Sequence, residues 1–212
     1  MKTILFTSLL FITSNLMASD STMSAYSKYG VGIRQGIGYN FLHYNYTPPT
    51  EVSNTFSFIN PAVFFEYRFT KMISGVSEIQ YISKGFEESK NNVTLKNTTN
   101  FIGLNLLGKL RMGDDNDHNF FNILAGPSLG YFIDGNVSNN QNSAYLDIKK
   151  DNMNPLTLST IVGMGYSHKW NRLECSIDLR GSINNMKVNK TGNYDILLNQ
   201  FSVNIGVMYF LK

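Results

Sequence analysis

Ten charged side chains stand at alternate positions of otherwise two-faced segments, and they are the residues of this sequence best placed to do chemistry. Six are basic and four are acidic: Arg34, Arg68, Lys84, Lys109, Arg111 and Arg180, with Glu66, Glu78, Glu174 and Asp178. In a narrow interior such groups can pair, because an unpaired buried charge is expensive. The same side chains can instead line a selective pore. We expect Arg34 to find its partners among the four carboxylates.

The other residues of reactive types lack the partner residues that a catalytic or metal site would need. His43 could activate a nucleophile, but nothing places a serine and an aspartate beside it, so a polar rim residue is favoured. The acidic stretch 114–117 lacks the twelve-residue ligand spacing of a calcium loop and is better explained as a turn. Cys175 is the only cysteine, which excludes an intrachain disulfide and a cysteine metal site. The sequence therefore predicts no catalytic residue, cofactor or metal, and a protein that is not an enzyme.

The segment 28–45, KYGVGIRQGIGYNFLHYN, contains the first of these charges and sets the pattern for the rest. Every second residue from Tyr29 to Phe41 is large and almost always apolar, and the residues between them are glycines, Arg34 and Asn40. A period of two indicates a strand with two different faces. Soluble strands run about 5–6 residues, so this length favours a wall between lipid and a crowded polar interior.

Seven further alternating segments follow, and the links between them alternate in length. The eight predicted strands cover residues 28–45, 56–69, 74–85, 100–111, 119–133, 155–167, 172–184 and 200–211. The longer links, which include 86–98 and 134–154, all fall at one end and the short ones at the other. This asymmetry is typical of outer-membrane barrels. We therefore predict an all-β, eight-stranded antiparallel up-and-down transmembrane β-barrel, with short periplasmic turns, longer extracellular loops, and its first and last strands paired.

A soluble calyx has the opposite arrangement, apolar inside and polar outside, and is the alternative. Three features favour the membrane barrel. Aromatic residues lie near the ends of the apolar faces, as at a membrane interface. The polar faces are rich in glycine, which relieves crowding in an interior only just wide enough for side chains. Those faces also hold charges of both signs, which can pair there.

The N-terminus and the composition bear on where the protein works. Residues 1–18 have a short basic start, an apolar core and a small-residue cleavage site, which predicts a signal peptide cut after Ala18. Residues 19–212 then form the outer-membrane β-barrel domain, exported to the outer membrane of a Gram-negative cell. No cysteine follows the cleavage site, so a lipoprotein is disfavoured. A net charge of +3 without a basic cluster argues against nucleic acid as a partner.

Several short motifs resemble the PorT-like, or outer membrane protein beta-barrel domain, family. They are GVGIRQG at 30–36, FEYRF at 65–69, SEI at 77–79 with KG at 84–85, LAGP at 124–127, and the terminal strand at 201–210. The resemblance implies an outer-membrane barrel, in a family whose biochemical role is usually unassigned. One departure is the C-terminus, where Leu211 and Lys212 follow the aromatic pair at which such barrels often end.

Two main functions fit this prediction. Eight strands leave little room for water, which favours a closed, salt-bridged interior and a structural or interaction role carried by the outer loops. The expected partners are outer-membrane lipid, the barrel-assembly machinery, and a protein or envelope component bound through those loops. The alternative is a porin or channel for small solutes. An outer-membrane lipid-modifying enzyme and a soluble calyx-type binding protein are less favoured.

Overall fold

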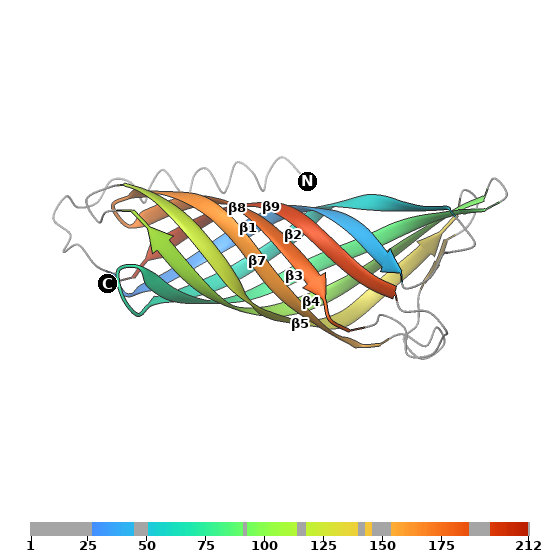
Figure 1. Cartoon of the computed structure of the whole chain (residues 1–212), viewed down its shortest axis with the longest axis horizontal. Coiled ribbons are helices and arrows are strands. Elements are labelled where there is room, and N and C mark those ends of the chain that lie inside the picture. Colours follow the sequence, from blue (N-terminus) through green and yellow to red (C-terminus); the bar gives the residue numbers. More distant parts are fainter. Residues whose placement is uncertain are drawn as a thin grey trace.

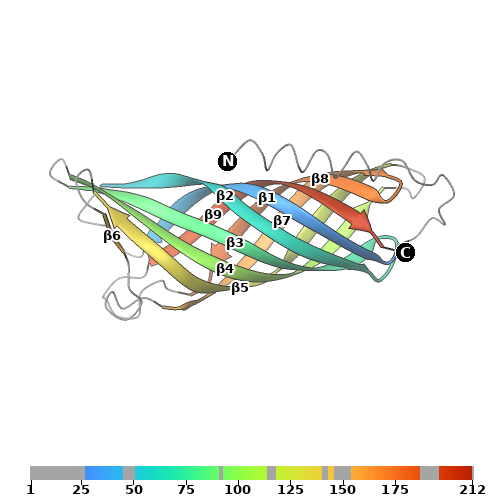
Figure 2. The ribbon, with the colours of Figure 1, turned by 180° about the vertical axis from the view of Figure 1, so that it is seen from behind.

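The computed structural model describes residues 27–44, 51–90, 93–113, 118–139, 143–145, 154–186 and 196–211. Eight long strands make one closed barrel, and a short ninth strand, β6, adds to the outer end of β5 (Figure 1 and Figure 2). The strands are β1 Tyr29–Tyr44, β2 Glu51–Arg68, β3 Ile73–Lys90, β4 Val93–Met112, β5 Asn119–Ser138, β6 Ser143–Tyr145, β7 Leu156–Trp170, β8 Leu173–Asn184 and β9 Ile196–Phe210. Within these ranges no helix is long and apolar enough to span a membrane.

Each long strand pairs antiparallel with its neighbours in the chain, and β1 pairs with β9 to close the barrel. The closing ladder is long and unbroken, from Gly30 opposite Phe210 to Tyr44 opposite Ile196. The predicted eight-stranded antiparallel barrel and the predicted pairing of its first and last strands are both confirmed.

The register of the ladders fixes the tilt of the strands. From Gly32, the sequence of partners through β2, β3, β4, β5 and β7 reaches Asn184 on β8. The shorter way round, through β9, reaches Glu174 on the same strand. The stagger is therefore ten residues, from 174 to 184. A stagger of about 33 Å around a circumference of roughly 38 Å inclines the strands by about 40°, as in outer-membrane barrels.

The apolar faces of the strands point outwards. Phe58, Val63 and Ile205 are 69%, 63% and 63% exposed, whereas the charged residues of the opposite faces are buried. A soluble calyx would require the reverse arrangement, so the structure supports the membrane barrel.

Two groups of aromatic rings mark the borders of the apolar surface on β1 and β2. At the short-turn end, Tyr29 lies 5.3 Å from Tyr67 between ring centroids. At the long-loop end, Tyr39 lies 4.9 Å from Phe56. Ten residues of β1 separate the two groups, about 33 Å along the strand, which the tilt reduces to about 25 Å along the barrel axis. This is the height of the apolar band of an outer-membrane barrel.

The strands extend further outwards than the sequence predicted. The predicted link 86–98 is wrong for most of its length, because β3 continues to Lys90 and β4 starts at Val93, paired throughout. In the predicted link 134–154, β5 continues to Ser138 and pairs with β6. Outside the lipid both faces of a strand meet water, so the apolar alternation disappears while the backbone ladder continues. The outer ends of β2 to β5 thus rise beyond the barrel on one side (Figure 1, right).

Candidate functional site in the barrel interior

The barrel interior collects all ten charged residues of the alternating segments. Each is at most 8% exposed, and they are the only charged residues buried in the part of the chain that the structure describes. They come from five strands, β1, β2, β3, β4 and β8. They form two clusters and leave one lysine apart.

The inner cluster, nearest the short turns, consists of Glu66, Arg68, Lys109, Arg111 and Glu174. Arg68 pairs with both carboxylates, at 3.2 Å from Nε to Glu66 Oε1 and 3.0 Å from Nη2 to Glu174 Oε2. Lys109 Nζ lies 2.9 Å from Glu66 Oε2 and 3.5 Å from Glu174 Oε1. Arg111 Nη2 lies 2.6 Å from Glu174 Oε2 and 3.8 Å from Glu66 Oε1. Three cations thus share two carboxylates.

The middle cluster consists of Arg34, Glu78, Asp178 and Arg180. Arg34 pairs with Glu78 and, at 3.1 Å from Nη2 to Oδ2, with Asp178. Arg180 approaches the same two residues, at 3.1 Å from Nη1 to Glu78 Oε1 and 3.3 Å from Nη2 to Asp178 Oδ2. Asn105 Nδ2 donates to Glu78 Oε1 at 2.8 Å. This cluster has balanced charges, and it gives Arg34 two of the four carboxylates proposed as its partners.

Lys84 lies apart, further towards the long loops. Its Nζ donates to Asn184 Oδ1 and to the carbonyl oxygen of Leu198, both at 3.2 Å. Across the described ranges no carboxylate lies within ion-pair distance of this ammonium, although the side chain is 95% buried.

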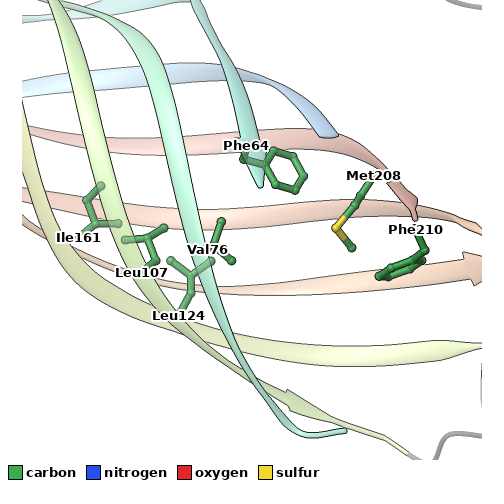
Figure 3. Close-up of a cluster of buried hydrophobic side chains, with 7 residues drawn as sticks. All are labelled: Phe64, Val76, Leu107, Leu124, Ile161, Met208 and Phe210. Atoms are coloured by element: carbon green, nitrogen blue, oxygen red, sulfur yellow. The ribbon is translucent and has the colours of Figure 1, made fainter. Parts of the chain in front are cut away.

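Apolar side chains also point into the barrel, beside the two clusters. Figure 3 shows seven of them, from β2, β3, β4, β5, β7 and β9: Phe64, Val76, Leu107, Leu124, Ile161, Met208 and Phe210. Rings of this interior lie against guanidinium groups. Arg34 Cζ is 4.5 Å from the centroid of Phe64, and Arg68 Cζ is 3.9 Å from that of Phe210. The interior is therefore packed with both apolar contacts and ion pairs.

The glycine face of β1 leaves room for side chains from its two neighbours. A Cβ at Gly32 would stand 2.6 Å from the carbonyl oxygen of Val207 and would collide with the ring of Phe64. A Cβ at Gly38 would stand 2.8 Å from Ser57 Oγ. Real Cβ atoms do not approach so closely. The backbone oxygen of Val207 makes glycine necessary at position 32, whereas at position 38 the side chains of Gln200 and Ser57 would have to move. The side chains of β2 and β9 fill the space that β1 leaves.

The remaining candidates from the sequence do not form a site. The strand of His43 is described but its side chain is not, and residues 114–117 lie outside the described ranges. Cys175 is half-buried. His168 Nδ1 lies 2.6 Å from Asn119 Oδ1 at the rim. In the described part of the chain, no three histidine, cysteine or acidic residues come together as metal ligands.

A closed eight-stranded antiparallel barrel, apolar outside and charged inside, defines an outer-membrane β-barrel protein. The chain belongs to the family described as outer membrane protein beta-barrel domain, whose model matches residues 13–188. The protein is accordingly a protein of the Gram-negative outer membrane. The match is to this wider family and does not confirm the PorT-like assignment.

Solved structures with the same fold are distant in sequence. The crystal structure of OprG from Pseudomonas aeruginosa matches with a TM-score of 0.53 and 11% identity, over 87% of this chain and 96% of that one. Neisserial surface protein A matches with a TM-score of 0.51 and 11% identity, over 89% and 98%. At such identity the likeness concerns the fold alone. A comparison with curated protein sequences finds no match.

Proposed function

We propose that this protein is a closed, non-enzymatic outer-membrane barrel of the PorT-like kind that acts as a structural or interaction protein through its outer strands and loops. The observation that carries the proposal is the filled interior. Two ion-paired clusters and the apolar side chains beside them occupy the space that a solute would cross. Eight-stranded barrels of this width hold side chains rather than a continuous water channel.

The outer sheet supports the second part of this proposal. The β2 residues 51–54 pair with β3 only, because the ladder with β1 ends at Thr55. β3, β4, β5 and β6 continue the sheet beyond that point. A protein that needed only to cross the membrane would gain nothing from this extension, whereas a partner outside the cell could contact it. Outer-membrane lipid around the barrel and the barrel-assembly machinery complete the set of proposed partners.

Export through a signal peptide cut after Ala18 is part of the same proposal, with residues 19–212 as the mature barrel domain. The proposal includes no catalytic role.

Conductance in planar lipid bilayers tests the closed interior. We expect the purified, folded protein to give no steady current. A stable ohmic conductance would refute the closed barrel and favour the channel for small solutes.

Trimming tests the role of the outer strands and loops. The variant replaces residues 86–98 by a two-residue turn and residues 134–154 by a short turn, and leaves the membrane-spanning strands intact. We expect the trimmed protein to fold into the outer membrane, and a strain that carries it to show the same envelope phenotype as a strain without the protein. If the trimmed protein restores the wild-type phenotype, the outer region is not the working part.

A further inference from the structure

One buried cation of the barrel interior, Lys84, stands apart from both charged clusters. The described residues of the interior comprise six buried cations and four buried carboxylates. The middle cluster is neutral, and Lys84 has no carboxylate partner in the described ranges. An uncompensated charge in a low-dielectric interior is expensive, so a counter-ion from solution would stabilise it.

Lys84 has capacity for such a ligand. An ammonium group has three N–H donors, and the two hydrogen bonds to Asn184 and Leu198 use two of them. Asn184 Oδ1 also accepts a hydrogen bond from Ser159. That oxygen is therefore shared between two donors and compensates the ammonium only in part.

A cavity adjoins Lys84 in the half of the interior nearer to the long loops. Its volume is about 30 Å³, enough for roughly two or three water-sized groups. Lys84 and Arg180 both line it, together with the hydroxyl-bearing residues Ser128, Thr157 and Ser159. No carboxylate is among its described lining residues. Arg180 Nε is buried and has no hydrogen-bond partner.

We propose that this cavity binds a small halide ion such as chloride between Lys84 and Arg180. Two cationic side chains and several hydroxyl-bearing residues line a space to which no carboxylate contributes, which is the chemistry of an anion site. The small volume selects a monatomic ion over a sugar, a nucleotide or a larger carboxylate. The ion would neutralise the positive charge of Lys84. This inference does not depend on the role of the outer loops.

Thermal unfolding at constant ionic strength tests the proposal. Sodium gluconate replaces sodium chloride stepwise, because gluconate is too large for the cavity. We expect the unfolding temperature of the wild-type protein to rise with chloride and to saturate, since the ion binds the folded barrel only. The Lys84→Met variant should lose this chloride-dependent shift, and in gluconate it should be at least as stable as the wild type.

Lys96→Met is the matched control. The Lys96 side chain is 55% exposed and pairs with Glu87 across β3 and β4. This variant should keep the full chloride dependence. A wild-type protein that does not respond to chloride, or a response of equal size in Lys84→Met, would overturn the proposal.

A direct measurement needs no variant. Crystals of the wild-type barrel grown in sodium bromide should give an anomalous difference peak between Lys84 Nζ and Arg180. Absence of a peak there at high bromide concentration would also refute the site, even if Lys84→Met failed to fold.

Discussion

Replacing Glu78 by glutamine should strongly destabilise the barrel. Glu78 is 1% exposed, pairs with both Arg34 and Arg180, and accepts a hydrogen bond from Asn105. Glutamine keeps the size of the side chain but removes its charge, so two buried guanidinium groups would share Asp178 alone. Removing one partner of a buried ion pair costs about 3–5 kcal/mol. We expect a loss of this order in the free energy of unfolding.

Urea titration of the protein refolded into lipid vesicles measures this loss. Trp170 is the single tryptophan, and its side chain is 46% exposed on the outside of the barrel near the short turns. Its fluorescence therefore reports insertion into lipid without a further label. Linear extrapolation gives the free energy of unfolding of each variant.

Glu87→Gln is the matched control for Glu78→Gln. It makes the same chemical change in an exposed ion pair, in which Glu87 lies 3.6 Å from Lys96. Exposed pairs contribute about 1 kcal/mol or less. If Glu78→Gln also costs about 1 kcal/mol or less, the interior is hydrated enough to solvate the two guanidinium groups, and the argument for a closed, ion-paired interior fails.

Three further predictions use other parts of the molecule. Gly32→Ala should destabilise the barrel by about 1–3 kcal/mol in the same titration, because the new Cβ meets Phe64 and Val207; Gly108→Ala, whose Cβ would come no closer than 3.8 Å to another residue, should be nearly neutral. Phe210→Leu should cost about 2 kcal/mol, because it removes the ring 3.9 Å from Arg68, and a cost below 0.5 kcal/mol would contradict this. Intact mass of the protein purified from outer membranes should correspond to a chain that begins at Ser19, and a mass that includes residues 1–18 would refute cleavage there.

The sequence was sufficient to place residues on the inside or the outside of the barrel. A strand has a period of two, and lipid demands an unbroken apolar face, so Arg34 and Glu78 could be assigned to the interior from their neighbours alone. The pairing of the first and last strands could also be predicted. With an even number of strands of alternating direction, the first and last strands run antiparallel and can pair to close the barrel.

The sequence could not say which charges meet. Alternation fixes the side of a residue but not its height in the barrel, and height depends on the stagger of ten residues between β1 and β8. Arg34 therefore meets Glu78 and Asp178, whereas Glu66 and Glu174 lie with the inner cluster. For the same reason the isolation of Lys84 could not be predicted.

An apolar cluster in the interior was not predicted, although the sequence carried a signal. Leu107, Leu124 and Met208 occur on faces that are otherwise polar or small, and such breaks in alternation mark the packed part of the interior. The outer hairpin of β3 and β4 was missed for a different reason. Above the membrane nothing requires an apolar face, so a paired strand and a polar loop have similar composition there.

An open pore and a closed, ion-paired interior, or plug, predict opposite effects of the Glu78→Gln substitution. Stability and conductance measured on this one variant therefore separate the two structures. In a pore, water solvates the guanidinium groups of Arg34 and Arg180, and Glu78→Gln should change the ion selectivity of an existing current at little cost in stability. In a plug, the wild type carries no current, and the same substitution lowers stability by several kcal/mol because the cations lose a buried partner. The cavity beside Lys84 is too small to alter this contrast, since it holds only roughly two or three water-sized groups. A change in ion selectivity without loss of stability would therefore identify a channel. A destabilised variant, together with a wild-type protein that carries no current, would identify a closed interior.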